Sequence, residues 1–87
     1  MKKVTIFSTR ICSYCQRAKL FFDKKNIAYE EIKIDENPEQ AKIMMEKSGR
    51  QSVPQIFIGS NLDYHVGGFD DLVDHDMDGK LQPLLED

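Results

Sequence analysis

The opening of the chain alternates between strand-like and helix-like segments, and this alternation limits the possible folds more than any other feature. Residues 3–8 are rich in the residues that strands favour. Residues 13–25 carry apolar side chains at the i, i+3, i+4 spacing of a helix, and residues 28–34 return to a strand-like pattern. A strand, a helix and a second strand in this order predict a parallel pair joined by a right-handed crossover.

Two helices are predicted in the first half of the chain. The first carries Ala18, Phe21 and Phe22 at the i, i+3, i+4 spacing, with Tyr14 and Cys15 one turn earlier on the same side. The second begins after Asn37, a suitable cap, with Pro38 at its first position and Gln40 where a capping box places its second member. It ends at Gly49. The side chains that we expect this helix to bury are Ala41, Met44 and Met45.

The second half predicts two strands and a short helical ending. Residues 53–58 and 62–66 are strand-like, and the turn at 59–61 between them makes the pair antiparallel. A helix over 69–77 follows, with a last turn or two over 81–85. The predicted order is β-α-β-α-β-β-α, which is an α/β fold.

Length and charge exclude several classes of protein. The 87 residues suit a single domain over 1–87. A net charge of −3 disfavours nucleic-acid binding, which needs a basic face. No apolar run is long enough for a membrane span or, after Met1, for a secretory signal. We therefore expect a cytoplasmic protein with no membrane partner.

The chain has only two cysteines, Cys12 and Cys15, with two residues between them. A small disulfide scaffold uses more cysteines at wider spacing. A structural zinc site needs about four ligands, and His65 and His75 supply no paired spacing. The cysteine pattern therefore favours redox chemistry in a reducing compartment.

Cys12 lies between the first strand and the first helix, where free N–H groups and the helix dipole favour a thiolate anion. Arg10, two residues earlier, adds positive charge. Cys15, one turn further on, can attack a mixed disulfide formed on Cys12, so the spacing supplies a nucleophile and a resolving thiol. The alternative, a pair of buried structural cysteines, fits Cys15 but does not fit Cys12.

Three segments resemble the glutaredoxin family and together span nearly the whole chain. They are Cys12–Lys19, Gly49–Ile58 and Val66–Leu72, and the ending Leu81–Leu85 resembles that of the small bacterial dithiol members. The resemblance implies a thioredoxin-like fold, in which helices flank a four-stranded mixed sheet. It also implies glutathione as the reducing co-substrate.

The resemblance further implies a groove for glutathione. Val53–Pro54 resembles the family's cis-proline segment, which leaves the Val53 backbone free to pair with the extended tripeptide. The helix start at Asp70 and Asp71 suits the γ-glutamyl group, although acidic residues there also simply complement the helix dipole. Tyr14 is expected beside the sulfur and Gln51 at the glycine carboxylate. The expected groove residues are Arg10, Tyr14, Gln51, Ser52, Val53, Pro54, Gly68, Phe69, Asp70 and Asp71.

Three positions depart from the common family pattern. Thr9 stands where many members have a lysine. Ser13 replaces the common proline and resembles members that hold a glutathione-ligated [2Fe–2S] cluster between two subunits. Residues 59–66 form a long connection, so Tyr64 and His65 are expected in a surface turn.

The sequence thus predicts a monomeric, glutathione-dependent thiol–disulfide oxidoreductase without a resident metal. Its expected partners are glutathione and disulfide-containing or glutathionylated proteins, with ribonucleotide reductase as a family-level candidate. Two alternatives stay open. One is a [2Fe–2S] carrier or sensor dimer with Cys12 as a cluster ligand, and the other is a redoxin fed by thioredoxin reductase, against which the segment Gly67–Asp71 argues.

Overall fold

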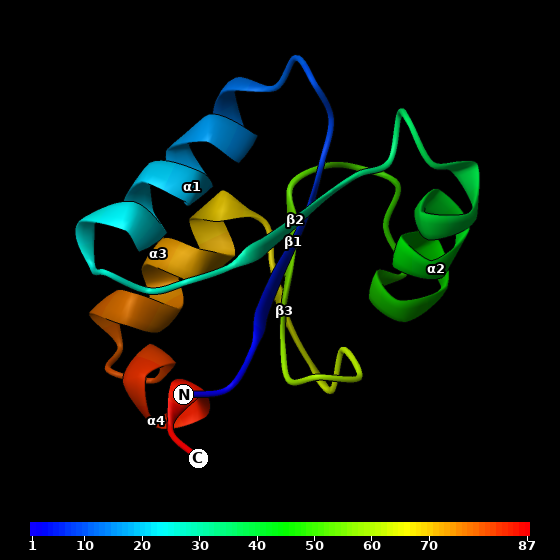
Figure 1. The fold of residues 1–87 in the computed structure, drawn as a ribbon. Coiled ribbons are helices and arrows are strands. Elements are labelled where there is room, and N and C mark those ends of the chain that lie inside the picture. Colours follow the sequence, from blue (N-terminus) through cyan, green and yellow to red (C-terminus); the bar gives the residue numbers. More distant parts are fainter.

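In a computed structural model that describes residues 1–87, four strands form one mixed sheet in the order β2-β1-β3-β4 (Figure 1). The central strand β1 (Val4–Ser8) is parallel to β2 (Glu30–Lys33) and antiparallel to β3 (Gln55–Ile58). The edge strand β4 (Tyr64–Gly67) is antiparallel to β3. The predicted parallel pair and antiparallel pair are both confirmed.

Helices cover both faces of the sheet. The helices α1 (Ser13–Lys24) and α3 (Phe69–Met77) lie on one face, next to α4 (Leu81–Leu85), and α2 (Pro38–Ser48) lies on the other (Figure 1). None of these helices has the length and apolar character needed to cross a membrane. The predicted four-stranded mixed sheet with flanking helices is therefore confirmed.

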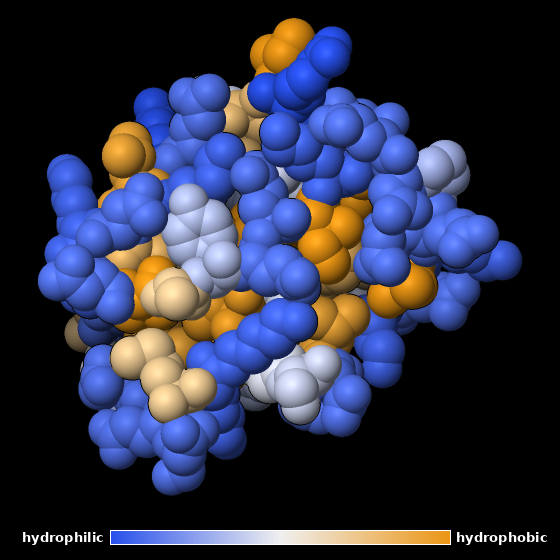
Figure 2. All heavy atoms as spheres, in the orientation of Figure 1, coloured by the Kyte–Doolittle hydropathy of each residue, from blue (hydrophilic) through white to orange (hydrophobic).

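The strands β1 and β3 send alternate side chains into two separate cores. On the α2 side, Phe7 and Phe57 pack edge to face with ring centroids 5.6 Å apart, against Met44. The larger core on the α1 and α3 side includes Val4, Ile6, Ala18, Phe22, Ile56 and Leu72. Outside these cores the surface is mostly hydrophilic, with apolar side chains visible only in patches (Figure 2).

In α1 and α2, the apolar side predicted from the sequence includes residues that the structure leaves exposed. Tyr14 of α1 is 50% exposed, and Met45 of α2 is 39% exposed, whereas Met44 is fully buried. The expectation that Met45 is buried is therefore wrong. The helix α2 meets only the small core, and the rotation of about 100° from one residue to the next turns Met45 away from the sheet.

Both ends of α2 lie at the predicted residues. The Asn37 side-chain oxygen accepts a hydrogen bond from the Gln40 N–H at 3.4 Å, but the reciprocal bond of a capping box is absent. Gly49 ends the helix with φ of 70°, a conformation that glycine adopts without steric cost.

All four strands begin one or two residues later than predicted, and the shift has a visible cause in β3 and β4. The strand β3 begins at Gln55, after the Val53–Pro54 peptide bond, which is cis. The strand β4 begins at Tyr64, because Leu62 has φ of 56°, outside the range of a strand. Tyr64 and His65 therefore lie in β4, and the expectation of a surface turn at these residues is wrong.

Candidate functional site

The sulfur of Cys12 caps α1. Cys12 has extended backbone angles, φ of −158° and ψ of 111°, and its Sγ accepts a hydrogen bond from the Cys15 N–H at 3.1 Å. The same sulfur lies 4.0 Å from the Val53 carbonyl oxygen. Cys12 is only half-buried. The structure therefore places Cys12 at the helix start, as predicted, with access to solvent.

Cys15 differs sharply from Cys12 in its surroundings. It is 1% exposed, and both cysteines are free thiols. Burial, followed by the hydrogen bond with Cys12, raises the pKa of Cys15 to about 12. Cys15 is therefore protonated near neutral pH. The site holds one accessible sulfur and one enclosed thiol, an arrangement that suits a nucleophile that meets the substrate first and a resolving thiol that acts second.

A groove of about 280 Å³ lies next to the Cys12 sulfur. It is formed by the start of α1, the loop before β3 and the start of α3. The cis bond of Val53–Pro54 lies in its wall. The lining residues are Tyr14, Arg50, Ser52, Val53, Pro54, Gln55, Gly68, Phe69, Asp70 and Asp71.

Most of the predicted groove residues meet here, but Arg10 and Gln51 do not line the groove. Both are exposed, and the Arg10 backbone N–H donates to Asp35 Oδ2 at 3.1 Å. Tyr14 lines the groove, and its ring tilts against Phe69 with centroids 6.4 Å apart. The backbone at Arg10 is thus tied to the loop after β2 rather than to the groove.

Arg50 is a groove residue that the sequence analysis missed. Its Nη1 donates to Asp71 Oδ2 at 3.0 Å, and the same oxygen accepts from the Gly68 N–H at 2.9 Å. The Gly68 N–H and then the Arg50 guanidinium hold the pKa of the Asp71 carboxyl below its ordinary value. Asp71 is therefore anionic and joins the two walls of the groove.

Gln55 is the second residue that was missed. It is 1% exposed, and its amide nitrogen donates to the Ser52 carbonyl oxygen at 3.0 Å and to Ser52 Oγ at 3.3 Å. Its Oε1 lies 2.6 Å from His65 Nε2, and the His65 ring stacks on Phe57 with centroids 4.8 Å apart. This network holds the loop that forms one wall of the groove.

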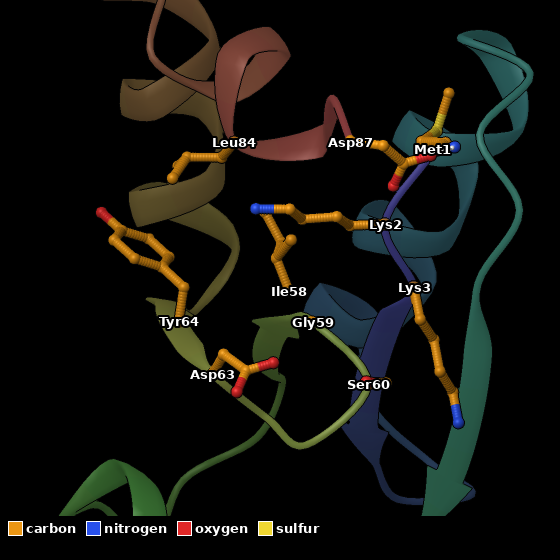
Figure 3. Close-up of a pocket in the computed structure, with 10 residues that line it drawn as sticks. All are labelled: Met1, Lys2, Lys3, Ile58, Gly59, Ser60, Asp63, Tyr64, Leu84 and Asp87. Carbon is orange, nitrogen blue, oxygen red and sulfur yellow. Dashed lines mark hydrogen bonds and ion pairs between the residues drawn. The ribbon is translucent and has the colours of Figure 1, made fainter.

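A larger hollow lies away from both cysteines. It has a volume of about 430 Å³ and is lined by Lys2, Ile58, Ser60, Tyr64 and neighbouring residues (Figure 3). Lys2 extends into this space in Figure 3, and no cysteine or histidine lines it. The chain also contains no group of three or more His, Cys, Asp or Glu side chains that could hold a metal ion. The groove next to Cys12 therefore remains the candidate site for thiol chemistry.

Comparisons with known proteins agree with this geometry. The family model named Glutaredoxin matches residues 4–62. Glutaredoxin 3 of Escherichia coli (strain K12) is 42% identical over 86 residues, which cover 99% of this chain and 100% of that protein. Glutaredoxin 1 of Rickettsia prowazekii (strain Madrid E) is 41% identical over 85 residues, which cover 95% of this chain and 86% of that protein.

Solved structures show the same likeness. The solution structure of glutaredoxin from Brucella melitensis has a TM-score of 0.81 and 45% identity, with coverage of 98% of this chain and 89% of that one. The crystal structure of a buckwheat glutaredoxin–glutathione complex has a TM-score of 0.82 and 33% identity, with coverage of 97% and 76%.

Proposed function

The chain belongs to the glutaredoxin family of thiol–disulfide oxidoreductases, and from this premise we propose that glutathione is its reductant. The proposed substrates are protein–glutathione mixed disulfides and protein disulfides. The observation that carries the proposal is the half-buried Cys12 sulfur at the start of α1, next to a groove with a backbone wall at Val53. The buckwheat relative was crystallised as a glutathione complex, which supports the same ligand in this groove.

With a mixed disulfide, the proposed reaction uses Cys12 alone. The Cys12 thiolate attacks the glutathione sulfur, the substrate leaves as a thiol after taking up a proton, and Cys12 becomes glutathionylated. A second glutathione thiolate attacks this new bond and forms oxidised glutathione. The Cys12 thiolate is then restored, and each cycle has oxidised one glutathione thiol and reduced one substrate sulfur.

With a protein disulfide, Cys15 takes part. Cys12 attacks one substrate sulfur, and Cys15 then attacks Cys12, so that both substrate sulfurs leave as thiols. Two glutathione molecules reduce the Cys12–Cys15 bond. The enclosed position of Cys15 favours this order, because the accessible sulfur meets the substrate first.

The groove positions glutathione for these steps. The Val53 backbone offers an edge to the extended tripeptide, and the N–H groups at the start of α3 suit the γ-glutamyl carboxylate. The Asp71 carboxylate suits the γ-glutamyl ammonium, and its contacts with Gly68 and Arg50 fix where it lies. The remaining proposed contacts are Tyr14, Ser52, Pro54, Phe69 and Asp70, with Arg10 and Gln51 outside the groove.

A two-substrate assay tests the proposal. Cys12→Ser should abolish reduction of a glutathionylated peptide and of a protein disulfide, whereas Cys15→Ser should keep the first activity and lose the second. Unchanged turnover by Cys12→Ser would refute the assignment. The alternative is a redoxin that thioredoxin reductase reduces. Supplying thioredoxin and thioredoxin reductase in place of glutathione tests it, and faster turnover with this reductant than with glutathione would favour the alternative.

The [2Fe–2S] alternative is favoured by one feature, the exposed Ser13 at the start of α1. Cys12 would be the one ligand from each chain, with glutathione thiolates supplying the others. Anaerobic reconstitution with iron, sulfide and glutathione tests it, and a product without visible absorption removes the alternative.

We place this activity in the reducing cytoplasm, where glutathione keeps thiols reduced. The proposed unit is a monomer of one domain. Ribonucleotide reductase is one candidate among the disulfide-containing protein substrates. Size-exclusion chromatography with light scattering would contradict the monomer by finding twice the mass.

A further inference from the structure

A partly buried polar network lies one helical turn from Cys15. Lys19 Nζ is 3.0 Å from Glu31 Oε2, and Ser8 Oγ donates to the same oxygen at 2.7 Å. The Lys19 and Glu31 side chains are 27% and 21% exposed, and Ser8 is fully buried. In every other ion pair of the chain, both groups are at least 36% exposed. This pair is therefore held more firmly than a surface ion pair.

The helix directs Lys19 toward Cys15. The two residues are four apart on α1, so they lie on the same side, about 5 to 6 Å apart at Cβ. Helical side chains lean toward the N-terminus, so the Lys19 stem covers the turn that contains Cys15. Glu31 on β2 and Ser8 at the end of β1 keep the ammonium group on this side.

Few groups influence the charge of the Cys15 sulfur. Besides burial, Cys12 raises the pKa of Cys15, and the Thr9 backbone and Lys19 lower it. Glu31, Tyr29 and Lys33 of the β2 region act on the network itself. When Cys12 is bound in a disulfide it carries no charge, so Lys19 is then the charged group that acts on Cys15.

We propose that Lys19, held by Glu31 and Ser8, is a positioning residue that favours the Cys15 thiolate in the resolving step. This inference rests on the proposed role of Cys15. Cys15 loses its proton and attacks Cys12, the Cys12–Cys15 bond forms, and the bond from Cys12 to the substrate sulfur breaks. The substrate sulfur leaves with the electron pair and takes up a proton, so the two cysteines are oxidised and the substrate is reduced.

The network also has an opening to solvent. Lys19 and Glu31 line a hollow of about 430 Å³ on the outer side of α1, together with Gln16, Asp23 and Tyr29. Solvent therefore reaches Lys19 and Glu31 from a hollow that shares no lining residue with the substrate groove.

A thiolate titration tests the charge effect directly. In the Cys12→Ser background Cys15 is the one remaining cysteine, and the NMR chemical shift of its ¹³C-labelled Cβ against pH reports on that thiol alone. Lys19→Gln should move the midpoint to higher pH, and Lys19→Arg should restore it. The matched control is Lys25→Gln, just after the end of α1, which breaks the 3.3 Å pair with Asp76 of α3 and should leave the midpoint in place. A Lys19→Gln midpoint equal to that of the parent would overturn the inference.

Turnover provides the second readout. Lys19→Gln should lower the rate with a protein disulfide, relative to the rate with a mixed disulfide, by roughly 3- to 10-fold near neutral pH. Its pH profile should move to higher pH. If Lys19→Gln does not fold, the double variant Lys19→Gln/Glu31→Gln removes both charges, keeps hydrogen-bonding groups and should show the same shift.

The two hypotheses fail differently. Normal reduction of a protein disulfide by Cys15→Ser contradicts the resolving role and hence the proposed function. Loss of that activity in Cys15→Ser, with an unchanged rate ratio and midpoint in the Lys19 variants, overturns only the role of Lys19.

Discussion

Arg50 and Asp71 join the loop before the cis Val53–Pro54 bond to the start of α3, with Arg50 Nη1 3.0 Å from Asp71 Oδ2. The two residues are 21 positions apart in the chain, and both line the groove. Their side chains are 47% and 40% exposed, so the pair adds little to the free energy of folding. Its main effect is to set the position of the Asp71 carboxylate.

Replacing Arg50 with methionine should therefore affect substrate binding more than stability. We expect KM for a glutathionylated peptide to rise roughly 3- to 10-fold, because Asp71 loses one of its two donors. The matched control is Lys3→Met, which breaks an equally exposed pair, Lys3–Glu30, away from the groove. Steady-state kinetics and thermal melts measure both effects, and equal KM changes in the two variants would contradict the prediction.

The Asp71 carboxylate should make stability depend on acid pH. The pKa of Asp71 in the folded state lies below its ordinary value of 3.8. The stability that the carboxylate contributes is therefore fully present above pH 3.8 and is lost as the pH falls toward the lowered pKa. Asp71→Asn should lower Tm near neutral pH, and the difference from the parent should shrink in acid. Melting curves across the acid range measure this, and a constant difference would show that charge is not involved.

His65 should add a second dependence on pH. Burial, and then Arg50, lower the pKa of His65 in the folded state below its ordinary 6.5. Protonation of His65 therefore favours the unfolded chain. The stability that neutral His65 contributes above pH 6.5 is lost as the pH falls below 6.5. His65→Gln keeps a hydrogen-bond donor for Gln55 Oε1 and should reduce the pH dependence of the unfolding free energy below pH 6.5. Urea denaturation at a series of pH values measures this. An unchanged slope of unfolding free energy against pH in the variant would exclude His65 as the cause of the pH dependence.

Two glycines should respond differently to alanine. Gly49 and Gly67 both have positive φ, 70° and 117°, but a Cβ at Gly49 meets nothing within 4 Å, whereas one at Gly67 collides with the Asp71 side chain. We expect Gly49→Ala to cost about 1 kcal/mol of unfolding free energy and Gly67→Ala about 2 kcal/mol or more. Only Gly67→Ala should also weaken substrate binding. Urea denaturation and KM measurements distinguish the two variants. Equal losses of unfolding free energy would contradict the prediction that a Cβ at Gly67 collides with Asp71.

Neighbouring methionines of α2 should also differ. Met44 is fully buried against Phe7 and Phe57, whereas Met45 is 39% exposed. Met44→Ala should lower the unfolding free energy by about 2 to 5 kcal/mol, and Met45→Ala by less than about 1 kcal/mol. Urea denaturation of the two single variants measures both costs. A large loss in Met45→Ala would place that side chain in the core.

The elements that the sequence predicted well are those set by local patterns. The opening β-α-β unit follows from strand-forming residues around a helical apolar spacing, and the ends of α2 follow from Asn37 and Gly49. Cys12 at the start of α1 follows from the same segments. How many residues of a helix are buried was harder to predict. Periodicity shows that α2 has an apolar side, but it does not show that Met44 is the buried residue of this helix.

The rest of the site depends on contacts between distant segments. The pairing of Arg50 with Asp71, and of Gln55 with His65, joins segments whose relative placement appears only in the folded sheet. The strand-like run over 53–58 marked Gln55 as a strand residue without showing its partner. The groove around Val53–Pro54 was predicted from the family resemblance rather than from the physics of the chain. Proximity in sequence suggested Arg10 and Gln51 as further groove residues, and neither lines the groove.

The hydrogen bond from the Cys15 N–H to the Cys12 sulfur links the proposed nucleophile to the first turn of α1. A thiolate is a strong acceptor, whereas a disulfide sulfur is a weak one. In the proposed reaction, we therefore expect each covalent intermediate on Cys12 to loosen the first turn of α1 and each release to tighten it again. Amide hydrogen exchange at Cys15 would then rise and fall with the catalytic cycle, so a backbone proton records the oxidation state of its neighbour.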